Sequence, residues 1–442
     1  MQDEVTRLLN QLGQQNSLWS SWTFQKVVMH LGSHSLIEYD HQNRTYSIHP
    51  LVHHWSGTTM EGNRHDMQRT ILTIIALSFS SARTDEDIKY RRKLFKHTTS
   101  SIASIKLEDI NPFVGMRIAQ IYDEAGHLKE TEALEMMAME KRKRVLGDDH
   151  PDTLRSMTNL AGTYRSQGRW SDAEALNLVV LEKRKSVLGD EHPNTLESMG
   201  DLARTYWCQG RWKEAEALEV VLMEKRKRVL GDDHTDTLTC MADLANTYKK
   251  QGRLKDAEVL EEVVMEKNKR LLGEDHPYTL IAMGNLAYTH MEQGHLKDAE
   301  TLGLVVLEKR KRLMGDEHPS TLRVMSNLAV TYWKQGRWED AEVLQVEAME
   351  KTKQVLGDDH HWTLENMANL ANTYKGQGRL EEAEVLGAEA MEKMRRAQGD
   401  DHPLTLMTMK NLAATYRSLG RSDDAEALEE VVKENRKHCE VS

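Results

Sequence analysis

Small and apolar residues recur along most of the chain with a constant spacing. The motif Gly-Asp/Glu-Asp/Glu-His returns every 42 residues from Gly147 to Gly399, and a second glycine keeps the same step from Gly168 to Gly420. These glycines divide each unit into two segments of helical length. A fixed period of roughly 20 to 50 residues is typical of a solenoid of stacked repeats. The pattern predicts two-helix repeats that begin near residues 147, 189, 231, 273, 315, 357 and 399.

The first segment of each repeat has the pattern of an amphipathic helix. Its apolar stripe follows the i, i+3, i+4, i+7 spacing, as in Met157, Leu160, Ala161 and Tyr164. The other repeats keep this stripe, except that His290 replaces the tyrosine. Since one hairpin cannot bury its own apolar face, we expect each to be stabilised by stacking on the next.

The second segment carries a matching stripe, formed in one repeat by Ala173, Leu176, Val180, Leu181 and Val187. Glu182, Lys183 and Lys185 lie largely off this stripe, and we expect them on a solvated outer face.

A degenerate hairpin precedes the regular repeats. Gly126 lies one period before Gly168, and Ala119, Tyr122 and Leu134 fall in register. We therefore predict an all-α solenoid over 111–442, with about eight hairpins, of which the first covers 111–146.

Residues 1 to about 110 lack the repeat. Two helical patterns are followed by a short hairpin pattern over Tyr39–Ile48, which together predict a small winged-helix-like module at 1–62. The segment 63–110 is predicted as a helical connector. A winged helix can bind DNA, but we favour a packing role for this module.

Short motifs in the repeats resemble a known family. Asn-Leu-Ala-x-Thr-Tyr, as in Asn159–Tyr164 and Asn327–Tyr332, is followed by Gln-Gly-Arg, Ala-Glu and Leu-Gly-Asp-Asp-His-Pro. This set resembles the tetratricopeptide (TPR) repeat of kinesin light chains over about three quarters of the chain. The resemblance implies a right-handed superhelix whose first helices line a concave, peptide-binding groove, and no catalysis.

The first module carries a second resemblance. Ser-Leu-Ile-x-Tyr-Asp from Ser35, and the run from Thr45 to Trp55, are similar to the winged-helix segment of fungal NLR-like (NB-ARC/STAND) proteins, which a repeat sensor follows. The nucleotide-binding core of that family is missing from this sequence, so ATP switching is not carried over. The resemblance implies the sensor half of such a protein.

Differences between copies gather on one face of the first helix. The positions of Arg155, Asn159, Gly162 and Arg165 lie at helical offsets and away from the apolar stripe; we call this the recognition face. Free drift of solvent-exposed positions is the alternative, but the outer positions of the Glu182 type hardly vary. The variable residues proposed to bind ligand, with adjacent lysines, are Arg204, Trp207, Asn246, Lys249, Lys250, Tyr288, Trp333, Lys334, Asn372 and Lys375.

One position of the recognition face is always Asn or Asp. A short amide can donate to and accept from the backbone of an extended peptide. A hydrogen bond to the adjacent helix is the alternative, although in related TPR proteins this asparagine contacts ligand. The residues are Asn159, Asp201, Asp243, Asn285, Asn327, Asn369 and Asn411.

The charge that a ligand would carry stays open. Kinesin light chains bind acidic peptides with an aromatic residue, and the lysines and tryptophans named above fit such a ligand. However, Asp201, Asp243 and Glu292 lie between them.

Overall composition limits the classes of partner and the cellular compartment that we expect. The net charge of -11 argues against a nucleic-acid surface, and the longest apolar run, Ile71 to Phe79, is too short for a membrane helix. The chain has three cysteines and no basic start, which favours a reducing, cytoplasmic location. Oligomeric state is not indicated.

No pattern of cofactor or metal chemistry is identified. The acid-rich His clusters of the repeats, such as Asp148, Asp149 and His150, fall at helix starts, where we expect the acidic side chains to cap free N–H groups. His49, His53 and His54 have no cysteine nearby to complete a zinc site. Phosphate-binding loops and common hydrolase motifs are missing.

The sequence therefore favours a non-enzymatic scaffold that binds a protein or peptide, as the sensing part of an NLR-like protein. Three alternatives remain: a kinesin-light-chain-like cargo adaptor, an enzyme with a site near the N-terminal module, and a self-associating solenoid.

Overall fold

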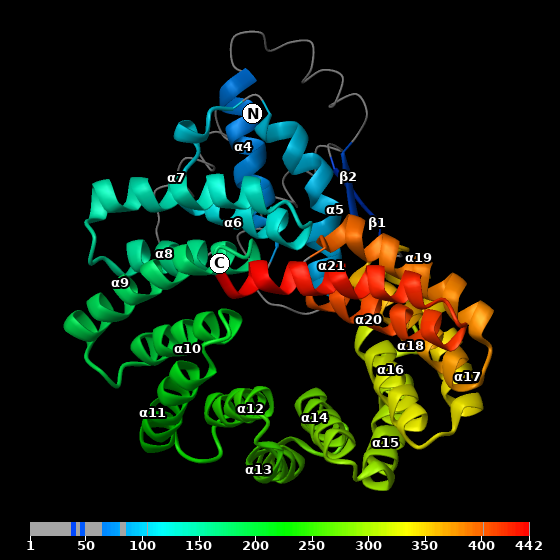
Figure 1. The fold of residues 1–442 in the computed structure, drawn as a ribbon. Coiled ribbons are helices and arrows are strands. Elements are labelled where there is room, and N and C mark those ends of the chain that lie inside the picture. The colour runs from blue at the N-terminus through cyan, green and yellow to red at the C-terminus, as the bar shows by residue number, and fades with distance from the viewer. Residues whose placement is uncertain are drawn as a thin grey trace. The chain divides into compact units, whose positions relative to one another are not determined.

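The computed structural model describes residues 37–40, 45–48, 64–79, 85–103, 105–400 and 402–441. The chain divides into two units, Met1–Leu218 and Glu219–Ser442. In each unit the helices lie side by side in chain order, and each packs on the next (Figure 1). This is the arrangement of stacked helical hairpins that the 42-residue period predicts.

Two short strands lie where the sequence predicts a hairpin. β1 (Ile37–Asp40) pairs with β2 (Thr45–Ile48) in antiparallel register, with Ile37 opposite Ile48. The other parts of the predicted winged-helix-like module, with His49, His53 and His54, fall outside the described residues. That module stays a prediction.

The segment before the first hairpin is helical. It forms α4 (Arg64–Leu77), α5 (Asp85–Ile102) and the 3-10 turn η1 (Leu107–Asp109). Leu72 and Ala76 of α4 share a core with Ile118 of α6 and Leu134 of α7. These helices therefore cover the end of the solenoid that the first hairpin would otherwise expose.

Successive helices of the solenoid pair into hairpins in chain order. In the first unit they are α6 (Pro112–Glu124) with α7 (Leu128–Leu146), α8 (Pro151–Ser166) with α9 (Trp170–Leu188), and α10 (Pro193–Cys208) with α11 (Trp212–Leu230), which crosses into the second unit. In the second unit they are α12 (Thr235–Lys250) with α13 (Leu254–Leu272), α14 (Pro277–Gln293) with α15 (Leu296–Met314), α16 (Pro319–Lys334) with α17 (Trp338–Leu356), α18 (His361–Gly376) with α19 (Leu380–Gln398), and α20 (Pro403–Ser418) with α21 (Ser422–Val441).

The turn inside each hairpin depends on its glycine. Gly168 has a φ of 77°, a left-handed conformation that side-chain-bearing residues rarely adopt. The backbone N–H of Arg169 then donates to the carbonyl of Tyr164 at 2.9 Å, which closes the end of the helix. This geometry brings the side chains of residues 164 and 169 together.

The expected capping by acidic side chains is wrong. The His150 ring caps α8, since its Nδ1 accepts from the backbone N–H of Asp152 at 3.1 Å. The same bond forms at the other six copies of this histidine. The acidic neighbours instead form ion pairs with the second helices on either side, as Asp149 does with Lys183 of α9 at 2.5 Å and Asp148 does with Lys143 of α7 at 3.4 Å. The histidine is the residue just before the helix, so its ring nitrogen can reach the free backbone N–H group two residues later.

The predicted core of the first helices is confirmed, with Leu160 and Ala161 buried. In α9, Val187 is 54% exposed, so its predicted burial is wrong. Arg184, one turn earlier, is buried instead, and its guanidinium donates to the carbonyl of Asn194 and to Ser198. A charged residue thus joins one hairpin to the next.

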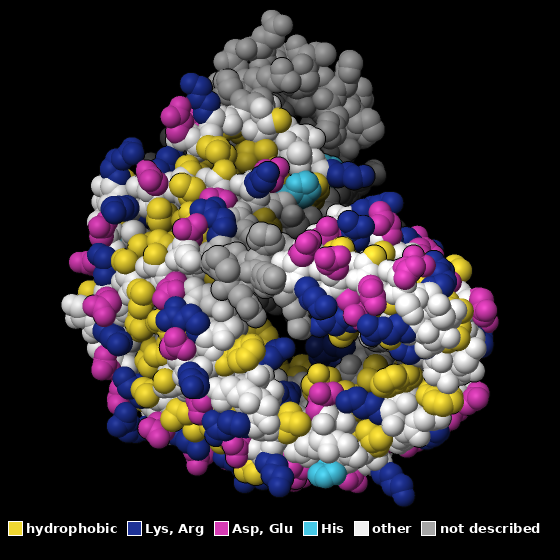
Figure 2. All heavy atoms as spheres, in the orientation of Figure 1, with side chains coloured by type: hydrophobic (Ala, Val, Ile, Leu, Met, Phe, Trp, Pro, Cys, Tyr) yellow, Lys and Arg dark blue, Asp and Glu magenta, His cyan; other side chains and the backbone are white. Residues whose placement is uncertain are grey.

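Positive and negative side chains alternate over the surface seen in Figure 2. Within the described part of the chain, no helix is both long and apolar enough to cross a membrane.

Candidate ligand-binding face

The recognition faces of neighbouring first helices lie next to each other. α8 contacts α10 in the first unit, and α14, α16, α18 and α20 contact one another in order in the second. Burial raises the pKa of the Tyr288 phenol on α14, and the charges of Glu292 and Glu365 add to this shift. Glu365 lies on α18, so the faces of helices two hairpins apart are close enough for charge to act between them.

The line of asparagines is free of internal partners. Five members of this line make no side-chain hydrogen bond within the described residues, namely Asn159, Asn285, Asn327, Asn369 and Asn411. The alternative, in which they bond to the adjacent helix, therefore does not hold for these five. Each is at least partly exposed. Asn246 and Asn372, on the same face, are likewise partly exposed.

The two aspartates in this line differ from the asparagines. Asp201 pairs with Arg204 at 2.7 Å, and burial raises the pKa of its carboxyl although Arg204 opposes the shift. Asp243 lies partly buried on α12. α10 therefore presents a charged pair where α8, α14, α16, α18 and α20 present free amides.

Two of the predicted basic groups are already neutralised. The Lys249 ammonium lies 2.7 Å from Glu261, with only 12% of the side chain exposed, and Lys334 lies 2.8 Å from Glu292. Lys375 makes no ion pair within the described residues. Lys375 is therefore the lysine of this set best placed to meet an acidic group.

The aromatic residues of the face differ in accessibility. Trp333 and Tyr288 are each 40% exposed, whereas the indole nitrogen of Trp207 is buried. Trp333 and Tyr288 can therefore offer ring surface to a ligand, while Trp207 is more enclosed.

A buried position of the second helix lies beneath the recognition face, and sequence reasoning missed it. Its side chains donate to or accept from a threonine of the next first helix: Glu135 with Thr163 at 2.6 Å, and Gln345 with Thr373 at 2.6 Å. In the sequence, this buried position can be recognised as a polar residue inside the apolar stripe of the second helix. The position holds Glu135, Asn177, Glu219, Glu261, Gly303, Gln345, Gly387 and Glu429.

Glycine at this position opens a pocket in the second unit. Gly303, Gly284 and Ala287 leave space between α14, α15 and α16, with Tyr288 and Asn327 also in the lining. The free space in this pocket is small, about 20 Å³, and it opens to solvent. It has room for about one methyl group beside the free amide of Asn327.

The cysteine that the structure buries is not activated. Burial raises the pKa of the Cys240 thiol to about 11, whereas a nucleophilic cysteine needs a lowered pKa.

Comparisons with known proteins agree with this architecture. Models of the tetratricopeptide repeat match residues 116–152, 153–194, 195–236, 237–278 and 279–320, and also 320–392 and 366–437. A search of curated proteins returns no match.

Several solved structures are similar. One, the nearly identical TPR-like repeats of a candidate kinesin light chain from Podosopora anserina, has 28% identity and a TM-score of 0.43 over 47% of this chain and 98% of that one. The apo quorum sensor NprR from B. thuringiensis has 15% identity and a TM-score of 0.57 over 85% and 98%. A STAND protein with a tetratricopeptide repeat sensor, from Pyrococcus horikoshii, has 14% identity and a TM-score of 0.52 over 98% and 62%.

Proposed function

Because the chain belongs to the tetratricopeptide repeat family, we propose that it binds an extended peptide or protein segment along its recognition face, without catalysis. The observation that carries this proposal is the line of asparagine amides with no partner among the described residues. An amide that is partly buried yet unbonded is poised to exchange water for a peptide backbone.

The second unit supports the proposal best. There Asn285, Asn327 and Asn369 stand on successive first helices, one in each hairpin. Each can donate to a peptide carbonyl and accept from a peptide N–H, which anchors a backbone regardless of its sequence. The pocket at Gly303 and the exposed rings of Tyr288 and Trp333 would then select side chains.

A sensing role fits the structural neighbours. Among the relatives with the same fold are a quorum sensor and the TPR sensor of a STAND protein. We place this chain in the same class of role, as the ligand-sensing part of an NLR-like system.

The test begins with selection of random peptides displayed on phage against the full chain. Peptides that bind are then measured by fluorescence polarisation against Asn285→Ala/Asn327→Ala/Asn369→Ala. Loss of three backbone anchors at about 1 kcal/mol each predicts an affinity loss on the order of 100-fold. The matched control, Glu308→Ala/Glu350→Ala, changes exposed positions on α15 and α17 and should bind as the wild type does. Equal affinity for all three proteins would reject the proposal.

A further inference from the structure

One hairpin differs from the others at the turn between its helices. At six of the seven regular hairpins a tyrosine is followed five residues later by an arginine. The arginine guanidinium lies 4.0 to 4.5 Å from the centre of the tyrosine ring. It also pairs with a glutamate of the preceding hairpin, as Arg337 does with Glu300 at 2.7 Å. The α14–α15 hairpin has His290 and His295 in these two places.

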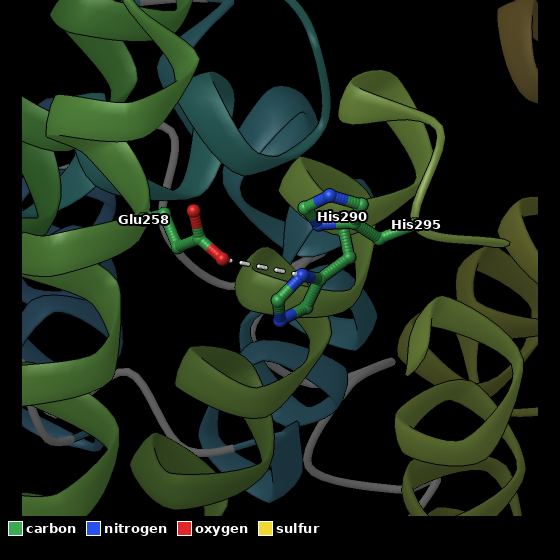
Figure 3. Close-up of side chains that lie close together, drawn as sticks. All are labelled: Glu258, His290 and His295. Carbon is green, nitrogen blue, oxygen red and sulfur yellow. Dashed lines mark ion pairs between the residues drawn. The ribbon is translucent and has the colours of Figure 1, made fainter. Parts of the chain in front are cut away.

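Both substitutions bring imidazole groups to the same carboxylate. The His290 Nδ1 lies 3.4 Å from Glu258 Oε1 (Figure 3). One ligand atom from each of Glu258, His290 and His295 lies within 4.8 Å of the others. Glu258 comes from α13, His290 from the last turn of α14 and His295 from the residue before α15.

The surrounding polar atoms also point to a missing partner. Gln293 donates to Glu258 Oε2 at 2.9 Å, which orients the carboxylate and leaves Oε1 turned toward His290. The His290 Nδ1 and the Gln293 Oε1 are buried and make no hydrogen bond within the described residues. In a regular hairpin the arginine donates to this glutamine oxygen, as Arg337 does to Gln335 at 3.2 Å. Exchange of arginine for histidine removes that donor and the positive charge.

Two imidazoles and one carboxylate form a donor set that zinc favours, with a fourth position open to water. A tetrahedral zinc with bonds of about 2.1 Å separates its ligand atoms by about 3.4 Å, which is the present spacing of Glu258 and His290. His295 is exposed, so its ring can rotate to close the remaining distance.

We propose that Glu258, His290 and His295 bind a divalent transition-metal ion of the zinc class. The ion restores the positive charge that the arginine supplies in other hairpins, and it joins α13 to the α14–α15 turn. This site lies at the hairpin turn, so the inference does not depend on the proposed peptide binding.

The experiment measures Zn²⁺ binding to the metal-free full chain at neutral pH by competition with a chromophoric chelator. The variant His290→Tyr/His295→Arg restores the residues of the six other hairpins and should therefore fold. We expect the wild type to bind one more Zn²⁺ tightly than this variant does, and its melting temperature to rise on Zn²⁺ addition by more than that of the variant. The matched control, His361→Pro, removes an exposed histidine elsewhere and restores the proline common at that place. It should keep the extra site.

A second variant tests whether the three residue types are sufficient. Tyr332→His/Arg337→His beside Glu300 copies the arrangement into the next hairpin, and should add one further tight Zn²⁺ site. The proposal is overturned if the wild type and His290→Tyr/His295→Arg bind the same number of Zn²⁺ ions with equal affinity. It is also overturned if His361→Pro loses the same site.

Discussion

Lys249 and Glu261 form an ion pair of 2.7 Å between the two helices of one hairpin, directly below the recognition face. Glu261 also accepts from Thr289 of the next hairpin at 2.5 Å. The corresponding residues of the first hairpin are Asp123 and Glu135, so a second negative charge replaces the lysine. The residue twelve positions before the buried one thus sets the charge that lies beside it in these two hairpins.

Glu135 should make the first hairpin sensitive to pH. Burial raises the pKa of Glu135 to about 7, and Asp123 adds to the shift, while the bond from Thr163 opposes it. Because the folded chain holds this proton more tightly than the unfolded chain, its contribution to stability is complete below about pH 4.5 and is lost as pH rises through 7. Glu135→Gln should therefore stabilise the first hairpins at pH 8 by up to about 3 kcal/mol and have little effect near pH 4.5.

Amide hydrogen exchange of α6, α7 and α8 at pH 6 to 8 reports this local stability. The reverse change, Gln345→Glu, places a carboxyl at the same position of the second unit and should introduce a pH dependence of the same sign. Equal protection from hydrogen exchange in the wild type and Glu135→Gln at pH 8 would show that ionisation of Glu135 does not lower the local free energy of unfolding.

Removal of the lysine should destabilise the second unit. Lys249→Met leaves the Glu261 carboxylate buried without its cation, at a cost of about 3 kcal/mol. Lys249→Met/Glu261→Gln should recover most of this loss, because Gln345 already occupies the equivalent place and bonds to its threonine. Urea denaturation of both single variants and the double variant measures the coupling. Additive effects of the two changes would contradict the structural pairing.

The pocket at Gly303 can be filled without disturbing the helix. Gly303→Gln removes a glycine from the interior of α15, which should add up to about 1 kcal/mol of stability. Its Cβ would lie 3.2 Å from the end of Leu328, which can shift by a few tenths of an ångström. A peptide with a side chain in this pocket should bind at least tenfold more weakly. Gly387→Gln is the control, since it gives the same gain in helix stability at a position outside the pocket. Equal affinities of the two variants for the peptide would show that the peptide binds elsewhere.

The repeat period determines most of what the sequence can predict. Glycines such as Gly168 and prolines such as Pro151 mark helix ends through local backbone preferences, so the helix boundaries follow from the chain alone. The burial of Arg184 does not follow, because hydrophobic patterning places every charged side chain in solvent. Its burial depends on acceptors ten to fourteen residues later, in the next hairpin.

The recognition face is predictable in position but not in charge. Asn327 and Lys334 are seven residues apart in one helix, close to two full turns, so periodicity alone places them on the same side. The neutralisation of Lys249 depends on Glu261 in the other helix of its hairpin, a tertiary contact outside the helical period. For the same reason the sequence shows His290 only as a departure from the stripe, whereas its grouping with Glu258 requires coordinates.

The capping histidines should make the solenoid weaker in mild acid. Burial lowers the pKa of the rings of His360 and His402, whose Nδ1 atoms accept from backbone N–H groups. A protonated ring cannot accept, so this contribution is present above the unfolded-state pKa of about 6.5 and is lost as pH falls through the lower folded-state value. Asparagine caps a helix without titrating, so His360→Asn/His402→Asn should retain about 1 kcal/mol per cap that the wild type loses by pH 5. Thermal denaturation between pH 8 and pH 5 measures this, with His97→Asn, an exposed histidine of α5, as the control. If the variant and the wild type lose stability equally on acidification, the acid-sensitive groups lie elsewhere, because burial lowers the pKa of these two capping rings.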